Sequence, residues 1–235
     1  MTRFVVKGEG SIYYTYNNCE LANDPKLTCL NFFLLTGFEP YWTYFENSSW
    51  VVAQEVAKCQ LTGISLCTEQ MPVSFARVKE AVGAAIQKHS PDLIIMLGQS
   101  GGSDRIKLER VAINLMDSKL PDNDGYIPNE AEIHKDGIPA LFTNTEIKSL
   151  KNSVEAQGVR VKISNSCGLY VCNRLYYEAL SICRSMPSTK ALFIHLPYYE
   201  GQSCAKPAKF TMPLHEMVRG VVTIIENNSG KYQEF

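Results

Sequence analysis

The chain has 235 residues, 45% of them hydrophobic and 20% charged, and its formal net charge is -1. This balance is that of a globular domain with one sizeable core, and the length demands no second domain. Without a basic excess, the composition favours neither a nucleic acid nor an anionic membrane as a partner, and no apolar run of about 18 residues predicts a transmembrane helix.

The N-terminal stretch and the cysteines indicate the cellular compartment in which the protein is expected. The stretch MTRFVVKGEGSIYYTY lacks the apolar core and cleavage site of a secretory signal, so we expect a cytoplasmic protein. The eight cysteines are then expected to be free thiols. No Cys-x-x-Cys pair occurs and no His lies three to five residues from another, so we expect no metal and no cofactor.

The predicted elements alternate between short apolar runs and amphipathic stretches. A strand is expected over Leu30–Thr36, followed by helices over Ser49–Gln60 and Ser74–His89. A continuous apolar strand over Leu93–Leu97 then opens into the turn Gly98–Gly102. Strands that are apolar on both sides are typical of a parallel sheet covered by helices.

The second half continues this alternation around a polar loop at Pro121–Gly125. Further strands are expected over Glu109–Met116, Val159–Ser164 and Ala191–Leu196, and further helices over Glu146–Gln157, Cys172–Ser185 and Phe210–Asn227. The pattern predicts an α/β fold, a single three-layer α/β/α domain over residues 29–235 with a twisted, mainly parallel sheet flanked by helices. Residues 1–28 do not follow it and are predicted to be an extension, with a possible β-hairpin over Arg3–Tyr16.

Sites in open α/β sheets form at the carboxyl ends of strands, and a cysteine follows one such end here. Cys172 comes after the strand Val159–Ser164, where a helix is expected to begin. A helix N-terminus favours negative charge, so the sequence predicts a cysteine that tends towards the nucleophilic thiolate. The backbone N–H groups of the same turn could bind an oxyanion.

Two further residues could complete a nucleophilic site. His195 ends the strand Ala191–Leu196 and could exchange a proton with the thiol and with a leaving amine. Glu109 could hold the imidazole tautomer and stabilise the imidazolium. Each residue also has an ordinary structural explanation: a hydrogen-bonded histidine, an inert packed cysteine, a solvated carboxylate beside Arg110. From spacing alone, a cysteine–histidine hydrolase is one hypothesis among several, and no substrate follows.

Five segments, taken together and in order, resemble the motifs of the pyroglutamyl peptidase I family. They are Leu34–Tyr41, Leu97–Gly102 with Leu108–Asn114, Pro121–Gly125, Ser164–Asn173 and Phe193–Pro197. The resemblance runs from about residue 30 to about residue 226. It implies a cysteine peptidase that hydrolyses the amide bond after an N-terminal pyroglutamyl residue.

The resemblance also assigns roles within the site. It implies Cys172 as the nucleophile, His195 as the base and Glu109 as the orienting acid. Cys167 stands where the family usually has alanine and is expected to be a packing residue. The oxyanion is expected at the Cys172 backbone and at Lys119, which replaces an arginine common in the family.

The implied substrate is a peptide that begins with a neutral five-membered lactam. Such a group needs a small apolar slot with aromatic walls and a few backbone donors and acceptors. By resemblance, Phe38 and Tyr41 wall the ring, Tyr170 and Val171 line it beside the nucleophile, and the backbone of Gln99 binds the lactam edge. An N-terminal proline, which lacks the lactam carbonyl, is expected to be a poor substrate. The family resemblance further implies a homo-oligomer, a dimer or a tetramer.

Four departures from the family pattern are visible. Tyr41 replaces a phenylalanine, Trp42–Tyr44 replaces glycines, Val73 stands where threonine is common, and Lys119 loses the planar fork of arginine. Three other hypotheses stay open, and the altered first loop motivates the first of them. One is a hydrolase of the same fold acting on another small cyclic or γ-glutamyl substrate; the others are a non-catalytic binding protein and a metal-dependent amidase.

Overall fold

The computed structural model of the chain describes residues 31–42, 44–202 and 210–229. The hairpin predicted over Arg3–Tyr16 lies outside the described residues. Within the described ranges, no helix combines the length and the apolar character that crossing a membrane requires.

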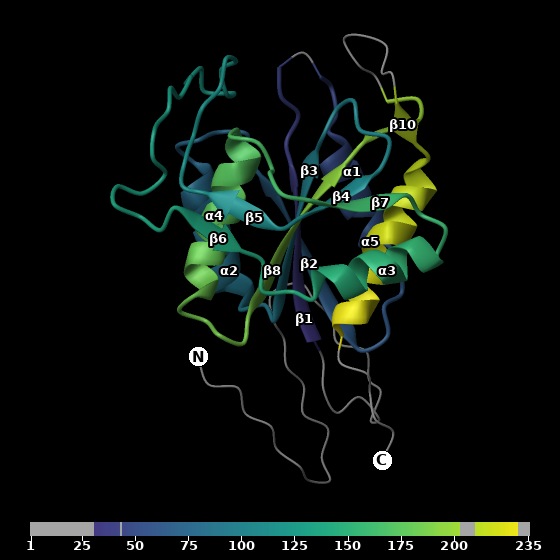
Figure 1. Cartoon of the computed structure of the whole chain (residues 1–235). Coiled ribbons are helices and arrows are strands. Elements are labelled where there is room, and N and C mark those ends of the chain that lie inside the picture. Colours follow the sequence, from purple (N-terminus) through teal and green to yellow (C-terminus); the bar gives the residue numbers. More distant parts are fainter. Residues whose placement is uncertain (1–30, 43, 203–209, 230–235) are drawn as a thin grey trace.

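A twisted six-stranded sheet lies between two layers of helices (Figure 1). Its strands run in the order β2 (Ile64–Met71), β1 (Asn31–Phe38), β3 (Leu93–Gln99), β8 (Lys190–Leu196), β4 (Ile106–Glu109) and β7 (Val161–Ser164). All neighbouring pairs are parallel except β4 and β8, which are antiparallel. The predicted three-layer fold with a mainly parallel sheet is therefore confirmed.

The strands alternate their side chains between two separate cores. On β3, Ile94 and Met96 pack in one core, whereas Leu93 and Ile95 pack in the other. The first core is covered by α2 (Val78–His89) and α4 (Val171–Cys183), and the second by α1 (Ser48–Val56), α3 (Ile147–Ala156) and α5 (Leu214–Asn228). Burial on both faces explains why β3 and β8 are continuous apolar runs.

The single strand expected over Glu109–Met116 is wrong, because the chain changes sheets at Arg110. The Arg110 N–H donates to the Ser164 carbonyl on one side, and the Arg110 carbonyl accepts from the Thr143 N–H on the other. β4 therefore ends at Glu109. A small antiparallel pair then follows, formed by β5 (Val111–Ile113) and β6 (Ala140–Phe142).

Other boundaries also differ from the sequence expectation. The edge strand β2 was not predicted, because it has one neighbour and its side chains are mostly half-buried. The last helix begins at Leu214 instead of Phe210, because Pro213 precedes it and β10 (Thr211–Met212) pairs with β9 (Tyr198–Tyr199).

Candidate active site

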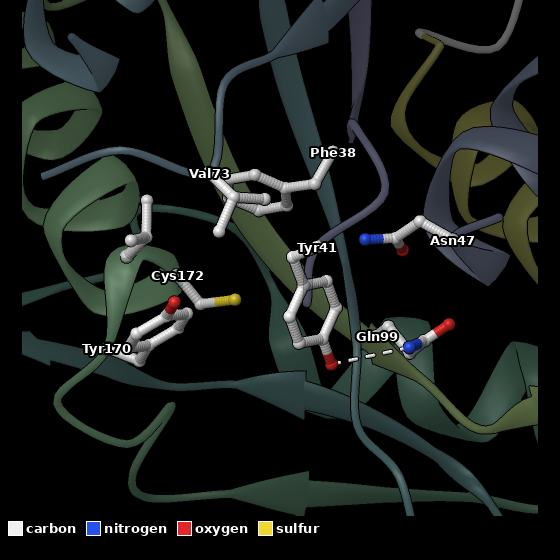
Figure 2. A pocket seen from close by; sticks show the side chains of 8 residues that line it. Phe38, Tyr41, Asn47, Val73, Gln99, Tyr170 and Cys172 are labelled. Atoms are coloured by element: carbon white, nitrogen blue, oxygen red, sulfur yellow. Dashed lines mark hydrogen bonds between the residues drawn. The ribbon is translucent and has the colours of Figure 1, made fainter. Parts of the chain in front are cut away.

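A small pocket lies beyond the carboxyl ends of β1 and β3, next to the start of α4 (Figure 2). It encloses about 300 Å³ including its mouth, and its lining is mostly apolar and aromatic. The lining residues are Phe38, Tyr41, Asn47, Val73, Gln99, Tyr170, Val171 and Cys172. The structure thus brings all five expected wall residues together with Cys172. Asn47 was not predicted as a site residue, because only its position before a helix distinguishes it in the sequence.

Cys172 is the second residue of α4, directly after Val171 and the N-cap residue Tyr170. Tyr170 has an extended backbone and its side chain does not cap the helix, so the first N–H groups of α4 have no partner within the helix. No other described residue accepts a hydrogen bond from the N–H groups of Val171 and Cys172, and the Cys172 N–H faces its own sulfur. They are therefore free to donate to a negatively charged oxygen near the thiol.

The environment of the thiol differs from the sequence expectation of a thiolate. Burial raises the pKa of Cys172 to about 12, and the negative charge of Glu109 adds to the increase. The favourable helix start is outweighed by the loss of hydration in a pocket with apolar walls. Burial therefore favours the neutral thiol, and a nucleophilic role would require a base that takes its proton.

His195 and Glu109 form a buried hydrogen-bonded pair. His195 Nδ1 lies 2.8 Å from Glu109 Oε1, and the carboxylate is fully buried. A carboxylate at Nδ1 fixes the proton there, which leaves Nε2 with a free lone pair. In the described chain no hydrogen bond joins Cys172 Sγ to His195, and such bonds often tighten only when a substrate binds.

Neighbouring groups fix the positions of this pair. The ring of Phe193 contacts the imidazole edge-on, with centroids 4.9 Å apart, and Gly98 leaves room for both rings. The Glu109 carbonyl accepts a hydrogen bond from the Tyr176 hydroxyl at 3.0 Å. The other carboxylate oxygen, Oε2, is buried and has no partner among the described residues. An under-solvated carboxylate interacts strongly with an imidazolium beside it.

Gln99 connects the pocket wall to the start of α1. Its Oε1 accepts hydrogen bonds from the Ser48 N–H at 2.9 Å and from Gln202 Nε2 at 2.6 Å. Its Nε2 donates to the Tyr41 hydroxyl at 3.3 Å, shown as a dashed line in Figure 2. These bonds engage both polar ends of the Gln99 side chain.

Asn173 is a positioning residue that the sequence analysis missed. Its Nδ2 donates to the carbonyls of Ile113 and Leu115 at 2.8 and 2.9 Å, and its Oδ1 accepts from the Ile113 N–H at 3.0 Å. Cys167 Sγ also donates to Oδ1, at 3.4 Å. These bonds fasten the start of α4, and with it Cys172, to β5. Cys167 is buried, which agrees with its assignment to packing.

Lys119 is not brought into the pocket. Its side chain is exposed, and it is not among the lining residues. The nearby Pro121 carbonyl instead joins two aromatic residues of the site, because it accepts from both Tyr170 and Trp42. In the residues that the structure describes, no three His, Cys, Asp or Glu side chains form a group that could hold a metal ion.

A sheet of this topology, with a buried histidine–carboxylate pair and a cysteine at a helix start beside a small pocket, defines a cysteine-type hydrolase. The sequence profile of the family described as Pyroglutamyl peptidase matches residues 32–231. The chain therefore belongs to the pyroglutamyl peptidase family.

Individual relatives agree with this membership. The chain is 36% identical over 193 residues to the pyrrolidone-carboxylate peptidase of Alkaliphilus oremlandii, covering 82% of this chain and 90% of that protein. It is 37% identical over 196 residues to that of Thermococcus onnurineus, covering 83% and 97%. The crystal structure of pyrrolidone carboxyl peptidase from Fervidobacterium islandicum matches with a TM-score of 0.80 at 35% identity, covering 84% of this chain and 97% of that one.

Proposed function

We propose that this protein hydrolyses the amide bond after the N-terminal pyroglutamyl residue of peptides, with Cys172 as nucleophile, His195 as proton carrier and Glu109 as orienting acid. The observation that carries this proposal is the 2.8 Å hydrogen bond between His195 and Glu109 beside the pocket that contains Cys172. The names of the relatives support the choice of substrate.

The proposed reaction is an acyl transfer in two steps. His195 Nε2 takes the proton of Cys172 Sγ, and the sulfur attacks the pyroglutamyl carbonyl carbon. The new oxyanion is held by the backbone N–H groups of Cys172 and Val171, which no other described residue engages. The imidazolium then protonates the amine as the C–N bond breaks, and His195 activates the water that hydrolyses the thioester.

The charge distribution of the pocket supports a neutral substrate group. None of the eight residues that line it in the described chain carries a charged side chain. A pyroglutamyl residue has no α-ammonium group and needs no acidic anchor, whereas an ordinary N-terminus would enter this pocket without a counter-charge. The aromatic faces of Phe38 and Tyr41 suit the flat lactam ring.

A reporter assay tests the proposal. A pyroglutamyl amide should be hydrolysed, iodoacetamide should abolish the activity, and Cys172→Ala should remove it. Preference for a glutaminyl or prolyl amide would instead favour the related hydrolase acting on another small substrate. Binding without turnover would identify a non-catalytic homologue, and loss of activity on chelation would favour a metal-dependent amidase.

The proposal also covers the cellular location and the oligomeric state of the enzyme. The cysteines of the described chain are all free thiols, which suits a reducing cytoplasm. We expect a homo-oligomer, a dimer or a tetramer, as the family resemblance implies. Light scattering of the purified protein measures that state directly.

A further inference from the structure

Trp42 occupies an unusual position at the edge of the pocket. It is 47% exposed, although tryptophan is normally among the more buried residues. Its backbone has a φ of 55°, a left-handed conformation that bulky residues rarely adopt. An exposed indole in an unfavourable backbone conformation contributes little to folding. The stability of the fold therefore does not explain why a tryptophan stands at position 42, and a role next to the pocket does.

The indole contacts two of the aromatic residues that line the pocket. Its ring lies edge-on to Tyr41, with centroids 4.8 Å apart, and its centroid is 6.3 Å from that of Tyr170. Its Nε1 donates to the Pro121 carbonyl at 3.1 Å, and the Tyr170 hydroxyl donates to the same oxygen at 2.9 Å. Trp42 is thus held firmly, although half of its surface faces solvent.

A second exposed apolar side chain precedes the residue to which the indole is hydrogen-bonded. Leu120, directly before Pro121, is 48% exposed. We define the aromatic rim as Trp42, Tyr170 and Leu120. The rim adjoins the nucleophile, because Tyr170 and Cys172 are separated by one residue at the start of α4.

The chemistry of the proposed reaction directs the substrate across this surface. With the lactam ring in the pocket and its carbonyl carbon at Cys172 Sγ, the rest of the peptide leaves through the mouth. The first side chain after the scissile bond then meets the surface next to Cys172. The aromatic rim is an apolar part of that surface.

We infer that the aromatic rim is a subsite for the side chain of the residue that follows pyroglutamate, and that it favours an aromatic or large apolar side chain there. The inference rests on the proposed function and deepens it. Ring-on-ring contact with Trp42 supplies the selectivity, because edge-to-face and stacked aromatic pairs are favourable beyond their buried area.

Competition between two substrates tests the inference. Pyroglutamyl-phenylalanine amide and pyroglutamyl-alanine amide are mixed, and the ratio of their kcat/KM values is measured for each variant. Trp42→Gly removes the ring and suits the left-handed backbone, and it should lower this ratio about 5- to 10-fold. Trp42→Phe keeps a ring and should hold the ratio within about twofold of the original. Phe142→Ala, which removes a ring on β6 that is even more exposed than Trp42 and does not line the pocket, should leave it unchanged.

A binding measurement gives a readout independent of turnover. The chain has two tryptophans, so Trp50→Phe leaves Trp42 as the only indole. In a Cys172→Ala background, pyroglutamyl-phenylalanine amide should change the indole emission at lower concentration than the alanine amide does.

The outcomes separate the two proposals. Hydrolysis with an unchanged ratio in Trp42→Gly would overturn the rim subsite and leave the proposed function standing. An absence of pyroglutamyl hydrolysis in the unmodified protein would overturn the proposed function. Equal emission changes with both amides would also contradict the rim subsite.

Discussion

Glu109 Oε1 and His195 Nδ1 lie 2.8 Å apart although 86 residues separate them along the chain. The contact exists because β4 and β8 are antiparallel neighbours, with Glu109 opposite Phe193 in the ladder. Side chains two residues apart lie on the same face of a strand, so Glu109 and His195 share the face that α4 covers.

Glu109→Gln should lower kcat/KM for a pyroglutamyl amide by about 10²- to 10⁴-fold, because the amide neither fixes the imidazole tautomer nor stabilises the imidazolium. Thermal stability should be unchanged or lower, because the amide still leaves one buried polar atom without a partner and loses the charge that faces the imidazole. Steady-state kinetics measure the change in kcat/KM, and thermal unfolding measures the change in stability. Glu80→Gln, an exposed residue of α2, is the matched control and should change neither.

The reaction of the free enzyme with iodoacetamide should be strongly pH-dependent. A raised pKa means that the folded protein holds the Cys172 proton more tightly, so the thiolate is a minor form at neutral pH. The inactivation rate should then rise about tenfold per pH unit between about pH 7 and pH 10. A rate that is constant above about pH 6 would instead indicate a thiolate–imidazolium pair in the resting enzyme.

Asn173→Ala should damage both stability and rate, because it leaves the Ile113 and Leu115 backbone groups without their side-chain partner. We expect a loss of about 2–4 kcal/mol in the free energy of unfolding, measured in urea. The variant should also lose kcat, because the start of α4 is no longer fastened to β5. Asn152→Ala on the exposed face of α3 should stay within about 0.5 kcal/mol. Unchanged kcat in Asn173→Ala would contradict the positioning role.

Gly98→Ala should reduce activity by displacing the imidazole. An added Cβ would lie 2.6 Å from the Phe193 ring and 3.1 Å from His195 Cδ2. Overpacking of this kind costs about 1–3 kcal/mol, and kcat should fall with it. Gly83→Ala is the control, since nothing lies within 4 Å of the added carbon in α2. It should raise stability by about 0.5–1 kcal/mol, and equal effects of the two changes would exclude the steric explanation.

Local sequence patterns located most of the elements that build the site, for physical reasons. β3 and β8 were recognisable because both of their faces are buried, and α4 because its apolar side chains recur at helical spacing. The edge strand β2 and the change of sheet at Arg110 were missed, because both depend on pairing partners distant in the chain.

The site itself was predictable only in part. Motif resemblance brought Phe38, Tyr41, Gln99, Tyr170 and Val171 together with Cys172, and they share one pocket in the structure. The state of the thiol was not predictable, because the helix start favours the charge whereas burial, which opposes it more strongly, appears only in three dimensions. The bonds of Asn173 to β5 likewise join segments that no local pattern connects.

The place of β8 between β3 and β4 has a consequence for how the enzyme matures. Until residues 190–196 leave the ribosome, the strands made earlier form two incomplete groups with exposed edges, and Glu109 has no imidazole to hold. The pairing of Glu109 with His195 therefore depends on the last strand of the main sheet to be synthesised. Under the mechanism proposed above, a nascent chain that lacks β8 should be inactive even though it already contains Cys172.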